Sequence, residues 1–242
     1  MPVLVTAIEL VLALLFVLIT RELFALIVSC GIHINRRLGM LLFTLMILVQ
    51  ILSGSRFPAA MLISSLVLSN VLFQRGNDYA GSMLSTTILF ASLLYLGSIY
   101  SILITALEQG KYVELGSFYL ILVARDTVAG IYGRLFSGKV MTDISPRKTW
   151  QGSLAGGIVA LSLWLWMAKG MGMAYEYAVL QGLGAGILGQ VGDLLGSALK
   201  RTAGVRHSGS LLGRMGGVID MFDSALFTLP FWYFFTLVGT QK

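Results

Sequence analysis

The chain has 242 residues, of which 57% are hydrophobic and only 12% are charged, whereas a soluble domain usually carries about 25% charged residues. Its apolar residues form long runs that are hydrophobic on all sides, a pattern that lipid tolerates and water does not. The sequence therefore predicts an all-α, polytopic integral membrane helical bundle and excludes a soluble protein. The only cysteine, Cys30, has no partner for an intrachain disulfide.

About eight transmembrane helices are predicted from the apolar runs. In chain order they cover residues 4–30, 40–53, 59–73, 79–107, 117–133, 153–172, 176–199 and 217–238. The second and third runs are short for a bilayer core that requires about 20 residues per helix. A single re-entrant hairpin over these two runs is the alternative, and it leaves the sides of the later loops unchanged.

The Lys and Arg residues between the predicted spans are unevenly distributed, with eleven on one side of the membrane and four on the other. Positive loops are retained in the cytoplasm, so the side with eleven charges is expected to be cytoplasmic and both termini outside. The net charge of +6 is explained by loops that face anionic lipid headgroups. No nucleic-acid partner is expected.

One glycine pattern is interpreted as packing rather than as a nucleotide site. Residues 184–189 fit G-x-G-x-x-G, but a dinucleotide fingerprint requires a preceding strand, and this segment lies inside an apolar helix. Gly182 and Gly186 have the small-xxx-small spacing that lets helices approach closely in lipid. Close helix packing is therefore predicted at these two positions.

Ionisable residues inside predicted spans indicate functional positions, because each costs about 2.5–3.5 kcal/mol at a helix centre on insertion scales. Asp126 shares a helix face with Gly130 and Gly133, which predicts a carboxylate beside a pocket floored by backbone. The alternative is internal charge compensation between Arg125 and Asp126, although adjacent helical residues point in different directions.

A second polar stripe is formed by Asp193, Ser197 and Lys200, which are spaced i, i+4 and i+7 on an otherwise apolar helix. Snorkelling of Lys200 and Arg201 to the interface explains the two cations. It does not explain Asp193, which lies roughly 10 Å deeper at a rise of 1.5 Å per residue.

A third position is the start of the last apolar run, where Asp220 and Asp223 share a helix face. Two like charges this close favour compensation by a hard divalent cation such as Mg²⁺. Gly216 and Gly217 permit a tight backbone approach, as phosphate sites often require. The alternative is a helix start at which carboxylates complement the helix dipole.

Basic residues precede this acidic pair at Lys200, Arg201, Arg206 and Arg214. Acidic groups for metal beside basic groups for phosphate are the components of phosphoryl or nucleotidyl transfer. Residues 192–224, GDLLGSALKRTAGVRHSGSLLGRMGGVIDMFDS, resemble the signature of the phosphatidate cytidylyltransferases (CDP-diacylglycerol synthases). The matching positions are Gly192, Asp193, Ser197, Lys200, Arg201, Gly216, Gly217, Asp220 and Asp223.

Two further blocks resemble the same family. Residues 144–152, ISPRKTWQG, are similar to its S-P-K-K-T-W-E-G loop, and residues 126–134, DTVAGIYGR, are similar to its D-[ST]-x-A-Y-x-x-G-R segment. The resemblance covers about residues 120–238. Four signature positions differ: Arg206 replaces Lys, His207 replaces Asp, Met215 replaces His, and Met221 replaces Arg.

The resemblance implies that a phosphatidate oxygen attacks the α-phosphorus of CTP, which gives CDP-diacylglycerol and pyrophosphate. It implies Mg²⁺, with a second cation as an option, held by Asp193, Asp220 and Asp223, which together with Lys200 are the expected catalytic residues. The expected substrate-binding residues are Ser197, Arg201, Arg206, Asp126, Ser145, Arg147, Lys148, Thr149, Gly216 and Gly217.

In this interpretation residues 1–116 form N-terminal transmembrane helices and residues 117–242 a C-terminal catalytic transmembrane region, within one integrated membrane domain. The expected location is the bacterial inner membrane with the active site facing the cytoplasm. The expected partners are CTP, phosphatidate or another lipid phosphate, and membrane lipids, and a homodimer is one arrangement considered. Two alternatives stay open: a cytidylyltransferase for another lipid phosphate, such as an isoprenoid one, and a non-catalytic membrane or transport protein on the same scaffold.

Overall fold

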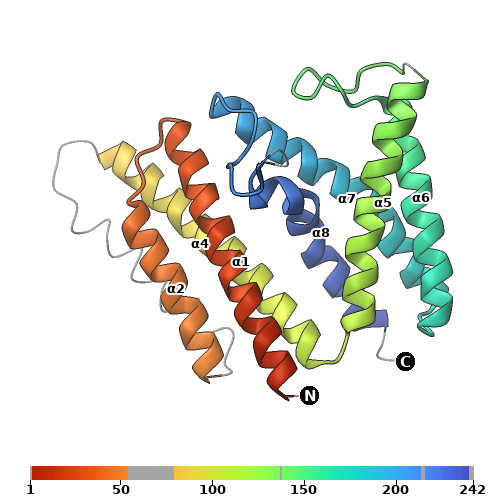
Figure 1. The fold of residues 1–242 in the computed structure, drawn as a ribbon, viewed down its shortest axis with the longest axis horizontal. Helices are drawn as coiled ribbons and strands as arrows, with labels where there is room; N and C mark the ends of the chain where they lie inside the picture. Colours follow the sequence, from red (N-terminus) through yellow and green to blue (C-terminus); the bar gives the residue numbers. More distant parts are fainter. Residues whose placement is uncertain (1, 54–78, 137, 214–215, 240–242) are drawn as a thin grey trace. The chain divides into compact units, whose positions relative to one another are not determined.

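The computed structural model describes residues 2–53, 79–136, 138–213 and 216–239. Within these ranges the chain forms seven α-helices and no strand (Figure 1). A single antiparallel β-bridge joins Val140 and Thr149. The predicted all-α class is confirmed. The chain divides into two compact units, residues 1–105 with 202–220 and residues 106–201 with 221–242.

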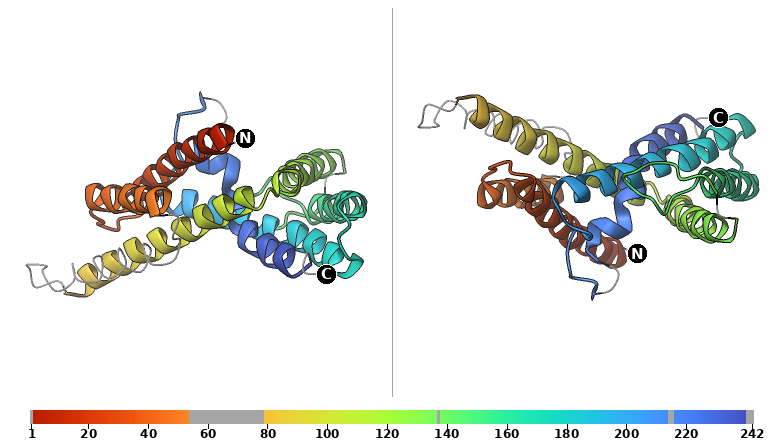
Figure 2. Two further views of the ribbon diagram at one scale, coloured as in Figure 1. Left: turned by 90° about the horizontal axis from the view of Figure 1, so that it is seen from below. Right: turned by 90° about the horizontal axis from the view of Figure 1, so that it is seen from above.

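The first unit contains α1 (Pro2–Ser29), α2 (Arg36–Ser53) and most of α4 (Tyr79–Glu108). Helices α1 and α2 lie side by side, as Figures 1 and 2 show. Aromatic residues form part of its core: Phe16 of α1 meets Tyr100 of α4 edge to face, with ring centroids 5.5 Å apart. Ser101 of α4 donates a hydrogen bond to the side-chain oxygen of Gln50 on α2 at 3.1 Å, which connects the two helices inside an otherwise apolar bundle.

The second unit contains α5 (Tyr112–Leu135), α6 (Trp150–Gly170), α7 (Tyr175–Thr202) and most of α8 (Val218–Gly239). Helices α5 and α6 run side by side (Figure 2). Their contact depends on small residues: a Cβ at Gly156 of α6 would lie 2.8 Å from the carbonyl oxygen of Arg125 on α5. A side chain larger than glycine at this position would keep the two backbones from approaching this closely.

The predicted packing role of Gly182 and Gly186 is confirmed. A Cβ at Gly182 would lie 3.0 Å from the Leu161 Cα, and one at Gly186 would lie 3.2 Å from the Gly157 Cα. Both neighbours belong to α6, so this pair of glycines seats α7 directly on α6.

Six of the described helices are long and apolar enough to cross a membrane. These spans are Thr6–Ser29, Ala80–Glu108, Tyr112–Leu135, Trp150–Gly170, Tyr175–Thr202 and Val218–Leu237. All seven described helices overlap a predicted apolar run, but α2 is not among the six spans. The predicted span 59–73 lies outside the described residues.

Candidate functional site

A polar cavity of about 240 Å³ lies in the second unit and gathers residues from α5, the loop before α6, α6 itself and α7. Six predicted site residues line this cavity: Asp126, Ser145, Arg147, Lys148, Thr149 and Asp193. Ala129, Gly130, Ser153 and Gln190 complete the lining. The blocks 126–134 and 144–152 and part of the block 192–224 therefore meet around one cavity.

The loop between α5 and α6 is shaped by its own backbone. Lys148 donates its amide to the Ser145 carbonyl at 3.0 Å, which closes a four-residue turn whose second position is Pro146. Proline favours that position because its fixed φ matches a β-turn. The Met141 amide donates to the Lys148 carbonyl at 2.8 Å, and Ser145, Arg147 and Lys148 of this turn line the cavity.

Thr149 ends this loop and starts the next helix. It is the N-cap of α6, with extended backbone, and its Oγ1 accepts the Gly152 amide at 3.1 Å. Such a cap satisfies one of the free N–H groups at a helix start. Thr149, predicted to bind substrate, thus stabilises the start of α6. Its side chain is buried, although the residue borders the cavity.

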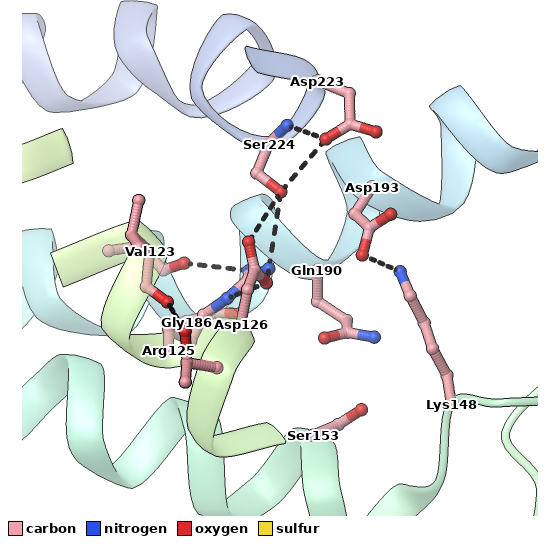
Figure 3. A network of polar contacts seen from close by, with 12 residues as sticks. Val123, Arg125, Asp126, Lys148, Ser153, Gly186, Gln190, Asp193, Asp223 and Ser224 are labelled. Carbon is pink, nitrogen blue, oxygen red and sulfur yellow. Dashed lines mark hydrogen bonds and ion pairs between the residues drawn. The ribbon is translucent and has the colours of Figure 1, made fainter. Parts of the chain in front are cut away.

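Asp193 of α7 forms an ion pair with Lys148 across the cavity, and both side chains are partly exposed. Figure 3 shows the Lys148 side chain reaching from the loop toward Asp193. Gln190, one turn earlier on α7, and Ser153 of α6 border the same space. This polar surface is therefore shared by three segments of the second unit.

The Arg125–Asp126 interaction that the sequence offered as an alternative is present. Arg125 is 1% exposed and pairs with Asp126, to which its Nε donates at 3.0 Å. Adjacent helical residues point in different directions, which counted against this alternative, but the guanidinium and the carboxylate do meet. Asp126 also lines the cavity together with Gly130, whereas Gly133, the third residue of that helix face, is not part of the lining.

Arg125 also connects three helices. Its Nη1 donates to the carbonyls of Ala185 and Gly186 on α7 at 3.4 and 3.3 Å, and its Nη2 donates to Ser224 of α8 at 3.5 Å. Ser224 in turn donates to Asp126 at 3.4 Å (Figure 3). A buried guanidinium in a span is tolerated because each of these groups satisfies a donor.

Asp223, in the second turn of α8, lies beside α7. Its Oδ2 is 3.7 Å from Lys200 Nζ, its Oδ1 accepts the Ser224 amide at 2.7 Å, and its side chain is 11% exposed. A Cβ at Gly196 would lie 2.9 Å from Oδ2, so glycine there makes room for the carboxylate. Ser224 Oγ lies 3.5 Å from Asp223 Oδ1 and 3.4 Å from Asp126 Oδ2, so it links the two carboxylates.

Asp220 belongs to the first unit, where its carboxylate accepts several hydrogen bonds. Oδ2 accepts the amides of Ser208 and Gly217 at 2.8 and 3.0 Å, and the Ser208 hydroxyl oxygen lies 3.1 Å away. His207 Nδ1 is 3.8 Å from the same oxygen. Gly216 has a φ of +94°, which favours glycine in this turn.

The remaining predicted site residues, Ser197, Arg201 and Arg206, lie outside the polar cavity. Ser197 is half-buried and Arg201 exposed on α7 in the second unit, whereas Arg206 is exposed in the first unit. None of the three lines the polar cavity. Met215, one of the signature departures, lies outside the described residues.

The arrangement of the acidic residues decides whether they could hold magnesium. Within the described ranges, no three His, Cys, Asp or Glu side chains lie close enough together to hold a metal ion. Asp126 and Asp223 nevertheless both lie within hydrogen-bond distance of Ser224, at 3.4 and 3.5 Å, and carboxylate oxygens are the donors that Mg²⁺ prefers. The donors fit magnesium in kind, with Lys148 and Lys200 as the present counter-charges of Asp193 and Asp223.

Sequence reasoning missed Gln190, Ser224 and Glu22. Gln190 extends the polar stripe of α7 by one turn before Asp193, so its spacing carried a signal. Glu22 is an acidic residue inside the first apolar run, and the cost of such a residue in lipid was the available signal.

A second, apolar cavity of about 440 Å³ lies between α6 and α7 and adjoins the polar one. Both cavities are lined by Ser153 and Gln190. The rest of the apolar lining is Met141, Trp150, Leu154, Gly157, Ile158, Leu161, Leu183, Gly186, Ile187, Val191 and Leu194. Charged and aliphatic surfaces thus meet at two shared residues.

A model of the Cytidylyltransferase family matches residues 2–238. The chain is 36% identical over 146 residues to a phosphatidate cytidylyltransferase of Bacillus subtilis (strain 168), which covers 58% of this chain and 54% of the relative. It is 39% identical over 119 residues to one of Synechocystis, covering 48% and 40%. It is 37% identical over 111 residues to the chloroplastic phosphatidate cytidylyltransferase 5 of Arabidopsis thaliana, covering 44% and 27%. The chain therefore matches about half or less of the length of these curated relatives.

Proposed function

Because the chain belongs to the cytidylyltransferase family, we propose that this integral membrane protein converts CTP and phosphatidate into CDP-diacylglycerol and pyrophosphate. An oxygen of the lipid phosphate forms the new bond to the α-phosphorus of CTP. The bond from that phosphorus to the bridging oxygen breaks, and pyrophosphate leaves with the electron pair. The protein's task is to place two anions together and to offset their charge.

The observation that supports this proposal best is the contact between the polar and the apolar cavity. Arg147 and Lys148 supply positive charge at the polar one, and aliphatic residues of α6 and α7 line the other. A substrate with a phosphate headgroup and acyl chains matches this pair of surfaces, with its headgroup near Ser153 and Gln190. CTP is polar and soluble in water, so it does not match the aliphatic lining of the apolar cavity.

The roles of individual residues follow from charge and position. Arg147, with its planar fork of donors, suits bidentate binding of a phosphate, and Lys148 acts as a point charge. Asp193 and Asp223, both in the second unit, would hold Mg²⁺. Asp220, whose Oδ2 accepts two backbone amides in the first unit, would position the start of α8 instead. When bound, the ion would offset negative charge on the phosphates. Lys200 lies against Asp223 and would take part in the same charge balance.

The positive-inside distribution supports an active site that faces the cytoplasm, since Arg147 and Lys148 belong to the side with eleven basic residues. The bacterial inner membrane is the proposed location, where CTP is supplied from the cytoplasm and the lipid from the bilayer.

The test is incorporation of radiolabelled CTP into lipid by the purified protein, with Mg²⁺ and a panel of lipid phosphates. Turnover with phosphatidate is expected, and it should fall at least about a hundredfold in Lys148→Met and Asp223→Asn. Asp143→Asn is the matched control, because Asp143 is an exposed acid of the same loop that does not line the cavity. Turnover restricted to an isoprenoid phosphate would move the assignment to that lipid. Absence of turnover with every lipid phosphate would favour a non-catalytic protein.

A further inference from the structure

A buried acidic residue in the first membrane span has no part in the proposed chemistry. Glu22 lies inside the span Thr6–Ser29 and is 5% exposed. Its neighbour Arg21 is exposed. An ionised side chain at such a position is costly unless hydrogen bonds replace its water.

Both carboxylate oxygens of Glu22 accept hydrogen bonds from residues almost 200 positions later in the chain. Oε1 accepts the Val218 amide at 3.0 Å, and Oε2 accepts the Ile219 amide at 3.0 Å and the Ser208 hydroxyl at 3.0 Å. Val218 and Ile219 open α8, where the first N–H groups lack partners within the helix and carry partial positive charge. Glu22 is therefore an N-terminal cap that comes from a different helix.

The space around this carboxylate admits only glycine at two loop positions. A Cβ at Gly209 would lie 2.6 Å from Glu22 Oε1, and a Cβ at Gly217 would lie 2.6 Å from the Glu22 Cδ. Both contacts are shorter than real Cβ atoms adopt. Gly217, predicted as a phosphate-binding residue, thus has a packing reason for its identity in this turn.

Ser208 joins Glu22 to Asp220. Its hydroxyl lies within hydrogen-bond distance of Glu22 Oε2 at 3.0 Å and of Asp220 Oδ2 at 3.1 Å, and its amide donates to Asp220 at 2.8 Å. Ser208, in the segment 203–213 that also carries Arg206 and His207, is thereby bonded both to α1 and to the first turn of α8. All of these groups belong to the first unit.

We propose that Glu22 is a positioning residue that fixes the segment 203–213 and the start of α8 against α1. Glu22 thereby sets the positions of Arg206 and Asp220 without touching substrate. Its role in turnover rests on the proposed function. Glutamine at this position retains one acceptor oxygen but places an NH₂ group against backbone N–H donors. Charge and one acceptor are lost with almost no change in volume.

The first measurement is turnover per folded molecule. Glu22→Gln is expected to lower kcat/KM for CTP roughly tenfold to a hundredfold, the change for losing one or two charge-assisted hydrogen bonds. Glu9→Gln is the matched control, since Glu9 is another acid of α1 and lies away from these contacts, and it should leave turnover unchanged. Ser208→Ala should lower turnover less, and should add little in the Glu22→Gln background because both act through one contact.

The second measurement does not depend on catalysis. In a Cys30→Ser background, a nitroxide at Ser210→Cys reports the mobility of the loop, because Ser210 is exposed and Cys30 is the only native thiol. Glu22→Gln should increase the mobility of this label and Glu9→Gln should not. Unchanged label mobility in folded Glu22→Gln would overturn the proposal. Increased mobility in a protein that turns over no lipid phosphate would support the role of Glu22 in the loop and refute the proposed function instead.

Discussion

Replacement of Arg125 by methionine tests the polar network that connects α5, α7 and α8. The guanidinium is 1% exposed, and donates to Asp126 at 3.0 Å and to the carbonyls of Ala185 and Gly186 at 3.4 and 3.3 Å. A methionine fills most of the same volume and removes every donor. Arg125→Met is therefore expected to lower the stability of the folded protein through lost hydrogen bonds rather than through a cavity.

The magnitude follows from the geometry. A hydrogen bond to a charged group contributes about 1.5–3 kcal/mol, and the lower end applies here because the Asp126 side chain is 42% exposed. The two carbonyl bonds are long, so together they contribute about 1 kcal/mol. The sum is about 2–3 kcal/mol, which for a chain of this length corresponds to a fall of roughly 4–12 °C in the unfolding midpoint.

The assay is thermal unfolding of the purified protein in detergent, with Arg134→Met as the control. Arg134 lies on the same helix but is exposed, and its Nε donates to the Gly130 carbonyl one turn away at 2.9 Å. Its replacement should change stability by less than about 0.5 kcal/mol. Adding Asp126→Asn to Arg125→Met should restore part of the loss, since it removes the carboxylate left without its counter-charge. Equal, small shifts for Arg125→Met and Arg134→Met would refute the reasoning.

Three further outcomes are expected. In the same thermal assay, Gly192→Ala should lower the free energy of unfolding by about 1–3 kcal/mol, because its Cβ would lie 2.7 Å from the Phe227 Cβ. Gly116→Ala is the control and should be neutral or stabilising, because the space there is open. Thr149→Ala should cost about 1 kcal/mol through loss of the cap on Gly152, and Thr149→Ser should not. Chelation by EDTA should abolish CTP incorporation and added Mg²⁺ should restore it; turnover that survives EDTA would contradict the proposed metal.

The membrane helices could be predicted because the length of an apolar run is a local property of the sequence. Helix ends were less accurate, since backbone hydrogen bonding continues past the apolar residues. The run expected at 117–133 belongs to a helix that starts at Tyr112, and the run expected at 153–172 belongs to one that starts at Trp150. In the second case the start is set by Thr149, a capping residue that hydrophobicity does not detect.

The site could be predicted where residues share a sequence block, and less well where contacts join distant blocks. Asp193 and Lys148 were both expected at the site, but their ion pair depends on how the loop folds over α7. Glu22 meets the start of α8 across almost 200 residues, and no local pattern specifies that partner. The presence of an acid in lipid was a signal for function, whereas the identity of its donors required the tertiary structure.

Asp220 is bound by backbone amides, whereas Asp193 and Asp223 are paired with lysine side chains. This difference determines which carboxylates could release their partner and bind a cation. The Asp220 Oδ2 accepts two backbone amides, which move only with the chain. Asp193 and Asp223 face the side chains of Lys148 and Lys200, and a lysine can turn toward a phosphate when one arrives and leave its carboxylate to a cation. Asp193→Asn and Asp223→Asn should therefore raise the Mg²⁺ concentration for half-maximal turnover, whereas Asp220→Asn should chiefly raise the mobility of a label at Ser210→Cys. A rise in the Mg²⁺ requirement for Asp220→Asn alone would reverse this assignment and make Asp220 the principal ligand.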